Sequence, residues 1–367
     1  MKRIVFYSMI LAVIVSMAAC TGDNTGTDGL SALNGTVLLS SDTGRIRSDG
    51  ESAVTFKVTL KSENGSKYDV TGQSDIYMEG TDVPLETNRF STDVGGTYVF
   101  YAKYGEALSE AISVEAYDDI PVLPEDTDEE NTDFRHRILI IQHTGTGCPN
   151  CPGMMKSLKT LSEDEEYNGF YHHVASHSYN KDDPAFSEDA YELSMTYNTS
   201  YLYPMLTFNL TETASSVDLD EIKGHIDVLK KPSADAGIAA AAGISGDEVI
   251  VNVQVKAAES NTFRVAAWLL EDDIQATQAG ATESWQGIHD NALRSISGSS
   301  FAGESIGKIP AGETGRKVLT LSLDDAWTRE NCEVLVLVTA AGPDGDYDVV
   351  NCAMCSIGGS VAYDYSR

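Results

Sequence analysis

The sequence predicts a multidomain α+β protein in which two β-rich regions flank a central α/β region. Apolar and polar residues alternate over residues 53–60 and again over residues 249–255, which is typical of half-buried strands. Between them, apolar residues recur at helical spacing from residue 154 onward. A chain of 367 residues that is 42% hydrophobic can bury two or three separate cores.

The N-terminus predicts export from the cytoplasm. Lys2 and Arg3 precede an apolar run at residues 4–17, which is shorter than the ~20 residues of a membrane-spanning helix. We therefore interpret residues 1–19 as a signal peptide. The small residues before Cys20 resemble a bacterial lipoprotein cleavage site, which implies that Cys20 carries a lipid. An ordinary cleaved signal, with Cys20 there by chance, is the alternative.

The composition limits the partners of the protein. It has 56 acidic and 25 basic residues, a net charge of −31. This balance argues against nucleic acid and anionic lipid as partners, because binding them needs clustered cations. The simplest interpretation is a solvated surface that keeps an exported protein soluble. Residues 20–31 are rich in Gly, Thr and Asp and predict a flexible tether.

Residues 32–117 predict a β-sandwich. Short alternating runs are separated by turn clusters such as Gly95-Gly96, the spacing expected of such a fold. The region contains no cysteine pair and resembles the immunoglobulin-like spacer modules of bacterial surface proteins. Residues 118–134 follow with two prolines and eight carboxylates and predict an extended acidic linker.

The central region, residues 135–232, begins with an apolar run that predicts a buried strand, followed by a turn and then Cys148-Pro149-Asn150-Cys151. Apolar residues at helical spacing come next, so we expect a helix that starts at Cys148. Unpaired N–H groups and the helix dipole there favour a thiolate. This arrangement of strand, turn and helix resembles a thioredoxin-like active site.

The rest of the central region predicts an α/β unit. Residues 171–178 predict a second strand, on which the adjacent His172 and His173 face opposite sides, one in the core and one at the surface. A helical stripe covers residues 186–197, and a third helix is expected to be capped by Ser215 or Ser216.

A proline leads directly into the next strand. Thioredoxin-like folds carry a cis-proline at this place, facing the two sulfurs, so the resemblance implies that Pro204 is cis and belongs to the site. The alternative is an ordinary turn proline.

Residues 233–367 predict a second β-sandwich. Residues 334–338 and 349–354 are expected to form a hairpin. Cys332, Cys352 and Cys355 lie on its two arms. A cross-strand disulfide is sterically feasible there, and an oxidising compartment would favour it. The sequence leaves open which two of the three cysteines would pair.

Taken together, these modules resemble the family of outer membrane protein twenty-eight, which are Gram-negative lipoproteins. Residues 142–152, residues 177–184 and Tyr203-Pro204 carry the likeness, residues 289–294 resemble it more loosely, and Leu210 departs from it. The resemblance implies a protein anchored in the outer membrane by its lipid, on the periplasmic face or at the cell surface.

Three interpretations of the cysteine pair remain. As a thiol–disulfide exchange site, Cys148 attacks a client disulfide, Cys151 resolves the mixed disulfide, and Pro204 lies beside them. As a metal site, His143 and His177 join the two cysteines. As a structural bond, the pair ties the start of the helix.

The sequence favours an outer-membrane-anchored envelope lipoprotein with a surface binding or assembly role. The alternative is a thiol–disulfide oxidoreductase that acts on envelope proteins. No Ser-His-Asp spacing, phosphate loop or HExxH motif occurs in the chain, and we expect no cofactor. The expected partners are the outer membrane, through the anchor, and envelope proteins.

Overall fold

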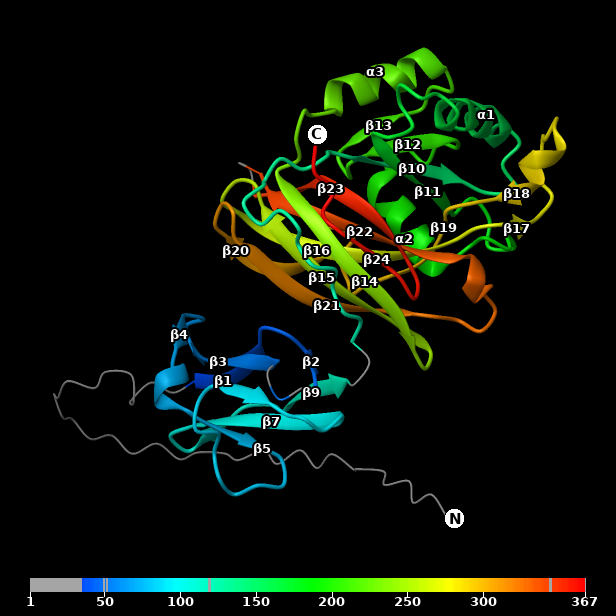
Figure 1. Cartoon of the computed structure of the whole chain (residues 1–367). Coiled ribbons are helices and arrows are strands. Elements are labelled where there is room, and N and C mark those ends of the chain that lie inside the picture. Colours follow the sequence, from blue (N-terminus) through cyan, green and yellow to red (C-terminus); the bar gives the residue numbers. More distant parts are fainter. Residues whose placement is uncertain (1–34, 49, 51, 118–119, 343–344, 367) are drawn as a thin grey trace.

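The computed structural model describes residues 35–366, apart from residues 49, 51, 118–119 and 343–344 (Figure 1). The expected signal peptide, tether and lipid-bearing Cys20 lie outside the described residues. Within them the fold is α+β, mostly strands with three α-helices, which confirms the predicted class. No helix in the described part of the chain has the length and apolar character needed to span a membrane.

The N-terminal unit consists of two sheets around one core. Phe56 and Phe100 meet in that core with ring centroids 4.7 Å apart. One sheet contains β1 (Gly35–Ser41), β3 (Ala53–Ser62), β4 (Lys67–Asp69) and β6 (Arg89–Ser91). The other contains β2 (Arg45–Arg47), β9 (Ile112–Tyr117), β7 (Gly96–Tyr104), β5 (Asp75–Met78) and β8 (Ala107–Leu108).

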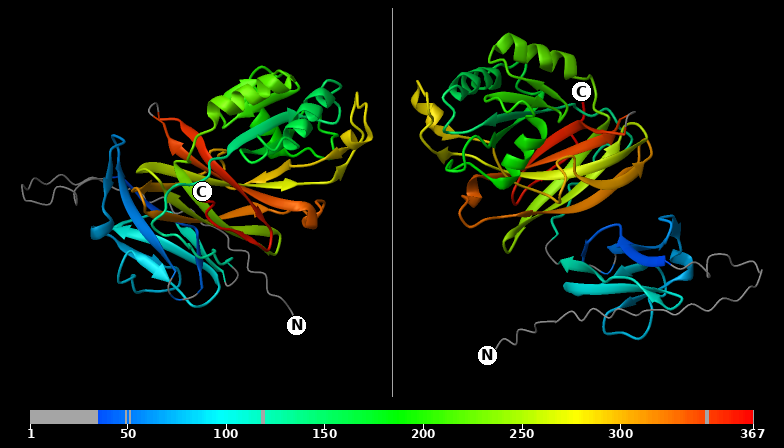
Figure 2. Two further views of the ribbon diagram at one scale, coloured as in Figure 1. Left: turned by 45° about the horizontal axis from the view of Figure 1, so that its top comes forward. Right: turned by 180° about the vertical axis from the view of Figure 1, so that it is seen from behind.

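The segment predicted as an acidic linker lies against the C-terminal strands. Phe134 is buried and forms isolated bridges with Ala234 and Tyr365. The buried Lys256 amino group donates to the Asp126 carboxylate at 3.0 Å. Figure 2 shows this segment running from the N-terminal unit along the larger body of the protein.

The α/β unit is a four-stranded arrangement with helices on both faces. Its strands are β10 (Ile138–Thr144), β11 (Tyr171–His177), β12 (Met205–Phe208) and β13 (Glu212–Ala214), in the order β13-β12-β10-β11. Its helices are α1 (Cys151–Ser162), α2 (Glu188–Tyr197) and α3 (Leu219–Leu229). Alternation along β10 sends Ile138 and Ile140 toward α1 and α3, whereas Leu139 and Ile141 face α2.

Two helix starts differ from those expected. The first helix begins at Cys151 rather than Cys148, because Cys148 lies in a turn whose N–H donates to the Gly145 carbonyl at 3.0 Å. The third helix is capped by Asp218, not by Ser215 or Ser216, since the Asp218 carboxylate accepts from the first free N–H groups.

The C-terminal region builds two packed sheets, whose facing side chains form a large apolar core. The sheet of the α/β unit continues from β11 into β19 (Ala292–Ile296), β16 (Asn261–Glu271), β22 (Cys332–Ala341) and β23 (Tyr347–Ser356), with β20 (Glu304–Ile309) beside β16. The second sheet contains β21 (Thr314–Ser322), β15 (Glu248–Ala257), β14 (Ala236–Ser245) and β24 (Ser360–Val361). A small ribbon is formed by β17 (Ile274–Gln275) and β18 (Ile288–His289).

The α/β unit and the C-terminal region share one core. Ala175 of β11 pairs with Ala292 of β19, which makes the sheet continuous. One apolar cluster contains Leu139 and Val174 together with Trp268. The central region, residues 135–232, and the C-terminal region, residues 233–367, therefore pack together as one body.

The expected hairpin is present, but its cross-strand disulfide was a wrong prediction. The pairing of β22 with β23 sets Leu337 opposite Cys352 and Val334 opposite Cys355. No cysteine of one arm thus lies opposite a cysteine of the other arm. Cys332, Cys352 and Cys355 are free and buried.

Candidate functional site

A buried disulfide lies at the start of α1. Cys148 and Cys151 are bonded to each other, and their exposed fractions are 1% and 0%. The Tyr203-Pro204 peptide bond is cis, as the resemblance implied. Because β10 pairs His143 with Met205, the proline lies at the same end of the sheet as the turn that carries the cysteines.

A segment from the C-terminal region covers this disulfide. We call residues 276–287, between β17 and β18, the strap. The Gln278 amide nitrogen donates to the carbonyl of Cys148 at 2.8 Å and to that of Gly145 at 3.3 Å. The Ala279 N–H donates to the Thr146 carbonyl at 2.7 Å. Three backbone acceptors of the cysteine turn are therefore occupied by the strap.

The strap touches the cysteine turn closely enough to require glycine. Gly280 has a φ of +73°, and a Cβ built on it would lie 2.3 Å from the Pro149 carbonyl oxygen. Further along, the buried Gln286 amide nitrogen donates to the Pro152 carbonyl at 3.1 Å. Sequence reasoning missed the strap, since its local signals are only two separate glycines, Gly280 and Gly287.

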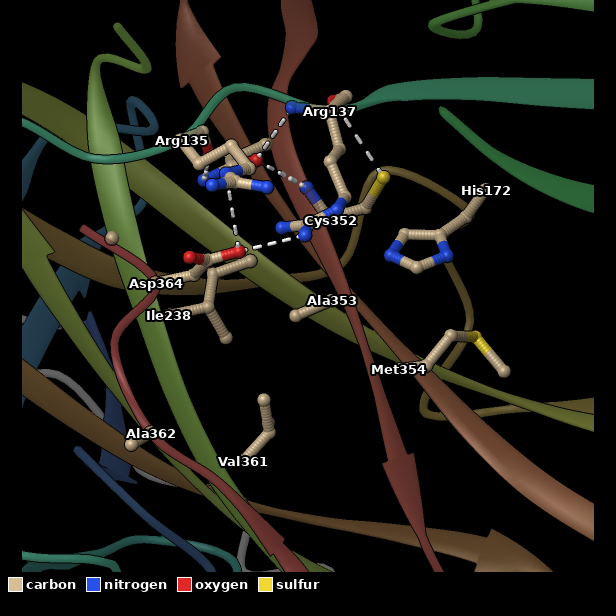
Figure 3. A pocket seen from close by; sticks show the side chains of 12 residues that line it. Arg135, Arg137, His172, Ile238, Cys352, Ala353, Met354, Val361, Ala362 and Asp364 are labelled. Atoms are coloured by element: carbon tan, nitrogen blue, oxygen red, sulfur yellow. Dashed lines mark hydrogen bonds and ion pairs between the residues drawn. The ribbon is translucent and has the colours of Figure 1, made fainter. Parts of the chain in front are cut away.

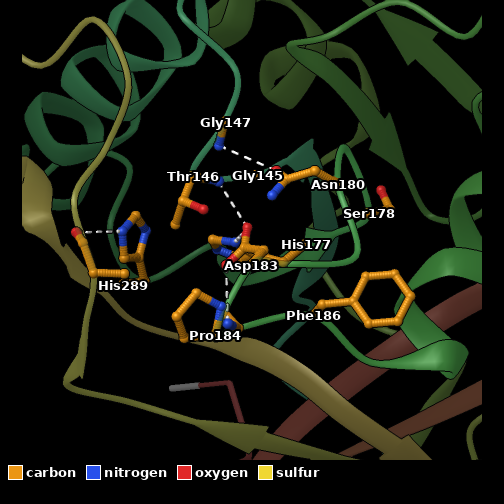
Figure 4. A network of polar contacts seen from close by, with 12 residues as sticks. Gly145, Thr146, Gly147, His177, Ser178, Asn180, Asp183, Pro184, Phe186 and His289 are labelled. Carbon is orange, nitrogen blue, oxygen red and sulfur yellow. Dashed lines mark hydrogen bonds and ion pairs between the residues drawn. The ribbon is translucent and has the colours of Figure 1, made fainter.

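A buried carboxylate ties the cysteine turn to β11 (Figure 4). Asp183 accepts from the Thr146 N–H at 2.7 Å and from His177 Nδ1 at 2.8 Å. Burial alone would raise the pKa of Asp183, but the hydrogen bond from His177 and those from the Thr146 and Ala185 N–H groups outweigh it and lower the pKa to about 2. The carboxylate is therefore ionised at neutral pH.

An arginine joins the same loop to the C-terminal sheet. Arg294 pairs with Glu271 at 2.7 Å, and both side chains are buried. Its remaining guanidinium nitrogens donate to the carbonyls of Phe186 and Pro184, each at 3.1 Å. The two stretches singled out in the sequence, residues 177–184 and 289–294, thus meet in space.

The structure separates the residues of the metal alternative. His143 is buried on the α2 face, where its ring nitrogens bond the Ser194 and Thr207 hydroxyls at 2.7 and 2.8 Å. Burial lowers the pKa of His143 to about 4. His177 lies on the α1 face, and the cysteines are bonded to each other. Among the described residues, no group of three or more His, Cys, Asp or Glu side chains is placed to hold a metal.

A small hollow on the other side of the sheet holds a free cysteine (Figure 3). It encloses about 140 Å³ and is lined by His172, Cys352 and the ion pair of Arg137 with Asp364, whose closest atoms are 2.6 Å apart. Burial raises the pKa of Cys352 to about 12, so this thiol is not a reactive one.

The two neighbouring histidines do not divide between core and surface as expected. His172 and His173 are both half-buried. They face opposite sides of β11, His172 toward the hollow of Figure 3 and His173 toward α1.

Comparison with known proteins identifies relatives. The profile of the family described as outer membrane protein Omp28 matches residues 192–360. No curated protein matches the chain. The solved structure of HBP35 of Porphyromonas gingivalis, which is thioredoxin-like, superposes with a TM-score of 0.53 at 15% identity and covers 64% of this chain and 79% of its own. An Agrobacterium tumefaciens protein from structural genomics gives a TM-score of 0.42 at 15% identity, covering 63% of this chain and 99% of its own.

Proposed function

We propose that this chain, in which residues 192–360 match the Omp28 family of outer membrane proteins, is an envelope lipoprotein whose thioredoxin-like unit serves in binding or assembly. The burial of Cys148 carries this proposal. An exchange site needs an accessible thiolate, whereas Cys148 is bonded to Cys151 and is only 1% exposed, and the strap bonds its backbone carbonyl. The disulfide then acts as a structural bond of the cysteine turn.

The N-terminal unit fits the role of a spacer. We take residues 32–117 as an immunoglobulin-like module, which is supported by two small sheets around one core of its own. Such a module, between a lipid anchor and the larger body, would hold that body away from the membrane surface.

Thiol trapping tests the binding role against catalysis. In Cys151→Ala, Cys148 loses its partner, and we expect it to form no mixed disulfides with proteins of an envelope extract. We also expect maleimide to label it only after denaturation, as located by mass spectrometry. Cys148→Ala is the control for labelling of the other cysteines. Mixed disulfides in Cys151→Ala that are absent from Cys148→Ala would refute the binding role as the sole function.

Mixed disulfides formed through Cys148 would support the second candidate function, thiol–disulfide exchange. One observation favours it: the disulfide lies at the N-terminus of α1, whose first residue is Cys151, and a helix N-terminus stabilises a thiolate. Exchange would require the strap to leave the cysteine turn, because its hydrogen bonds cover that turn.

Cell fractionation tests the anchor. Cys20→Ala should move the protein from the detergent-extracted membrane to the soluble envelope fraction, because the lipid supplies the membrane affinity. Its circular dichroism spectrum should not change, since residue 20 precedes every described element. A variant that stays in the membrane fraction would rule out the lipid anchor.

A further inference from the structure

A cavity of about 340 Å³ lies between α1, β11 and residues 285–291, and we call it the histidine pocket. Polar side chains line its inner end, from β10, β11 and β18. These are Gln142, Thr144, His173, His177 and His289. None of the sequence motifs accounts for this combination.

The strand register explains why the pocket is hollow. In the parallel pair of β10 and β11, Gln142 lies beside Ala175. His173 and His177 are two residues to either side of Ala175, so all three point to the same face. The small alanine leaves a space that the two imidazoles flank.

Two buried polar groups in this pocket have no hydrogen-bond partner among the described residues. The Gln142 side chain, in a residue with an exposed fraction of 3%, leaves its amide nitrogen without an acceptor. The Nε2 atom of His173 is likewise buried without a hydrogen bond. Buried polar groups are nearly always paired in folded proteins, so these atoms point to a bound molecule that supplies the partners.

One of the other two imidazoles presents an acceptor. Asp183 accepts the Nδ1 proton of His177, whose ring also lines the pocket (Figure 4). His289 donates from Nε2 to the Ala276 carbonyl at 3.3 Å, so its Nδ1 is an acceptor in the neutral ring. The pocket thus offers the Gln142 amide as a donor and Nδ1 of His289 as an acceptor.

The charges around the pocket disfavour an anion. Burial, aided by the nearby His177, lowers the pKa of His173 to about 4 and also lowers that of His289, so both rings are neutral near pH 7. The ionised Asp183 lies directly behind His177. At the mouth of the pocket, the positive charge of the exposed Lys159 is balanced by the negative charge of the exposed Asp290. His177 and Asp183 together carry no net positive charge, so a carboxylate would enter without a net buried positive charge to pair with it.

The walls of the pocket are apolar. Met155 and Leu158 come from α1, and Trp285 and Ile288 lie on the facing segment. A ligand with an aromatic or aliphatic body can bury that surface between them.

We propose that the histidine pocket binds an uncharged small molecule that joins an apolar body to an amide group. The amide oxygen accepts from Gln142, and the amide N–H donates to Nδ1 of His289. A carboxylate lacks the donor, and an ammonium lacks the acceptor. This inference goes beyond the proposed role and does not depend on whether the disulfide exchanges.

Three probes of equal size test the ligand class. Phenylacetamide, phenylacetate and phenethylamine share one ring and differ in the end group. Titration of the full mature chain, followed by NMR at pH 7, should give phenylacetamide at least about tenfold tighter binding than either charged probe, the effect expected for one or two hydrogen bonds. Equal affinity for the amide and the carboxylate, or no binding of the amide, would overturn the proposal.

Two variants locate the site. Gln142→Met should weaken phenylacetamide binding about tenfold while the urea midpoint stays equal or rises, because an unpaired buried amide is removed. Gln73→Met, at an exposed glutamine of the N-terminal unit, is the matched control and should change neither. Ile288→Trp changes a mouth residue that is 39% exposed, and it should block binding without loss of stability. Unchanged affinity in Ile288→Trp would refute this location even if Gln142→Met failed to fold.

Discussion

At the scale of single residues, two buried charges decide how the cysteine turn is held. Asp183 accepts from the Thr146 N–H of the turn, and Arg294 donates to the carbonyls of Pro184 and Phe186, which follow Asp183 in the chain. Both charges have partners: Asp183 accepts hydrogen bonds from His177 and from the N–H groups of Thr146 and Ala185, and Arg294 pairs with Glu271. A buried charge is tolerated only with such partners, so removal of one partner should be costly.

Arg294→Met tests this dependence. It leaves Glu271 buried without its cation and should lower the free energy of unfolding by about 3–5 kcal/mol, as measured in urea. Arg329→Met is the control, because Arg329 pairs with Asp325 at the surface, with exposed side-chain fractions of 35% and 87%. It should cost less than about 1 kcal/mol. Equal losses of unfolding free energy in the two variants would show that the buried pair of Arg294 and Glu271 stabilises the protein no more than the surface pair does.

At the scale of elements, the strap holds the turn that carries the disulfide. Its hydrogen bonds occupy the carbonyls of Thr146 and Cys148 in that turn. The close approach of Gly280 to Pro149 makes the fit sensitive to one added carbon atom.

Gly280→Ala should lift the strap. The methyl group of the new alanine would clash with the Pro149 carbonyl. We therefore expect a soluble phosphine to reduce the Cys148–Cys151 bond several-fold faster than in the unchanged protein. The rate is measured by alkylating the freed thiols and counting them by mass spectrometry. Gly246→Ala is a matched control, since Gly246 also has a positive φ, +61°, but a Cβ there would meet no atom within 4 Å. An unchanged reduction rate in Gly280→Ala would show that the strap does not limit access.

At the scale of the whole molecule, the α/β unit depends on the C-terminal region. The continuous sheet and the shared cluster around Trp268 bury the α2 face of β10 and β11. The N-terminal unit, in contrast, has a core made entirely of its own residues.

A truncation tests this division. A chain of residues 120–366 should unfold cooperatively in urea, whereas residues 120–232 should not, because its apolar face loses the covering strands. Residues 35–117 serve as the control for an independent core. A cooperative transition in residues 120–232 would show that the α/β unit folds by itself.

The strands and the cysteine-bearing turn were predictable from the sequence pattern, whereas the cis form of Pro204 was implied by the resemblance to thioredoxin-like folds. The pattern at residues 138–141 and the spacing of Cys148 and Cys151 act within a few positions of one another, and short-range geometry determines the result. Helix starts were displaced by a few residues because several polar side chains compete for the same free N–H groups, as Asp218 and Ser216 show.

Only the tertiary structure decided what surrounds those elements. Gln278 reaches a carbonyl 130 positions earlier in the chain, and Ala175 meets Ala292 in one sheet. No local pattern encodes such pairings, since they depend on how whole sheets pack. His173 and His177 could have been placed on one face of a strand by their spacing, but the pocket beside them exists only because α1 and residues 285–291 close over it. The sequence alone therefore determined which reactive and polar side chains are present, such as the cysteine pair and the histidines. The packing of the sheets and helices determined which of these side chains are buried and which line a pocket.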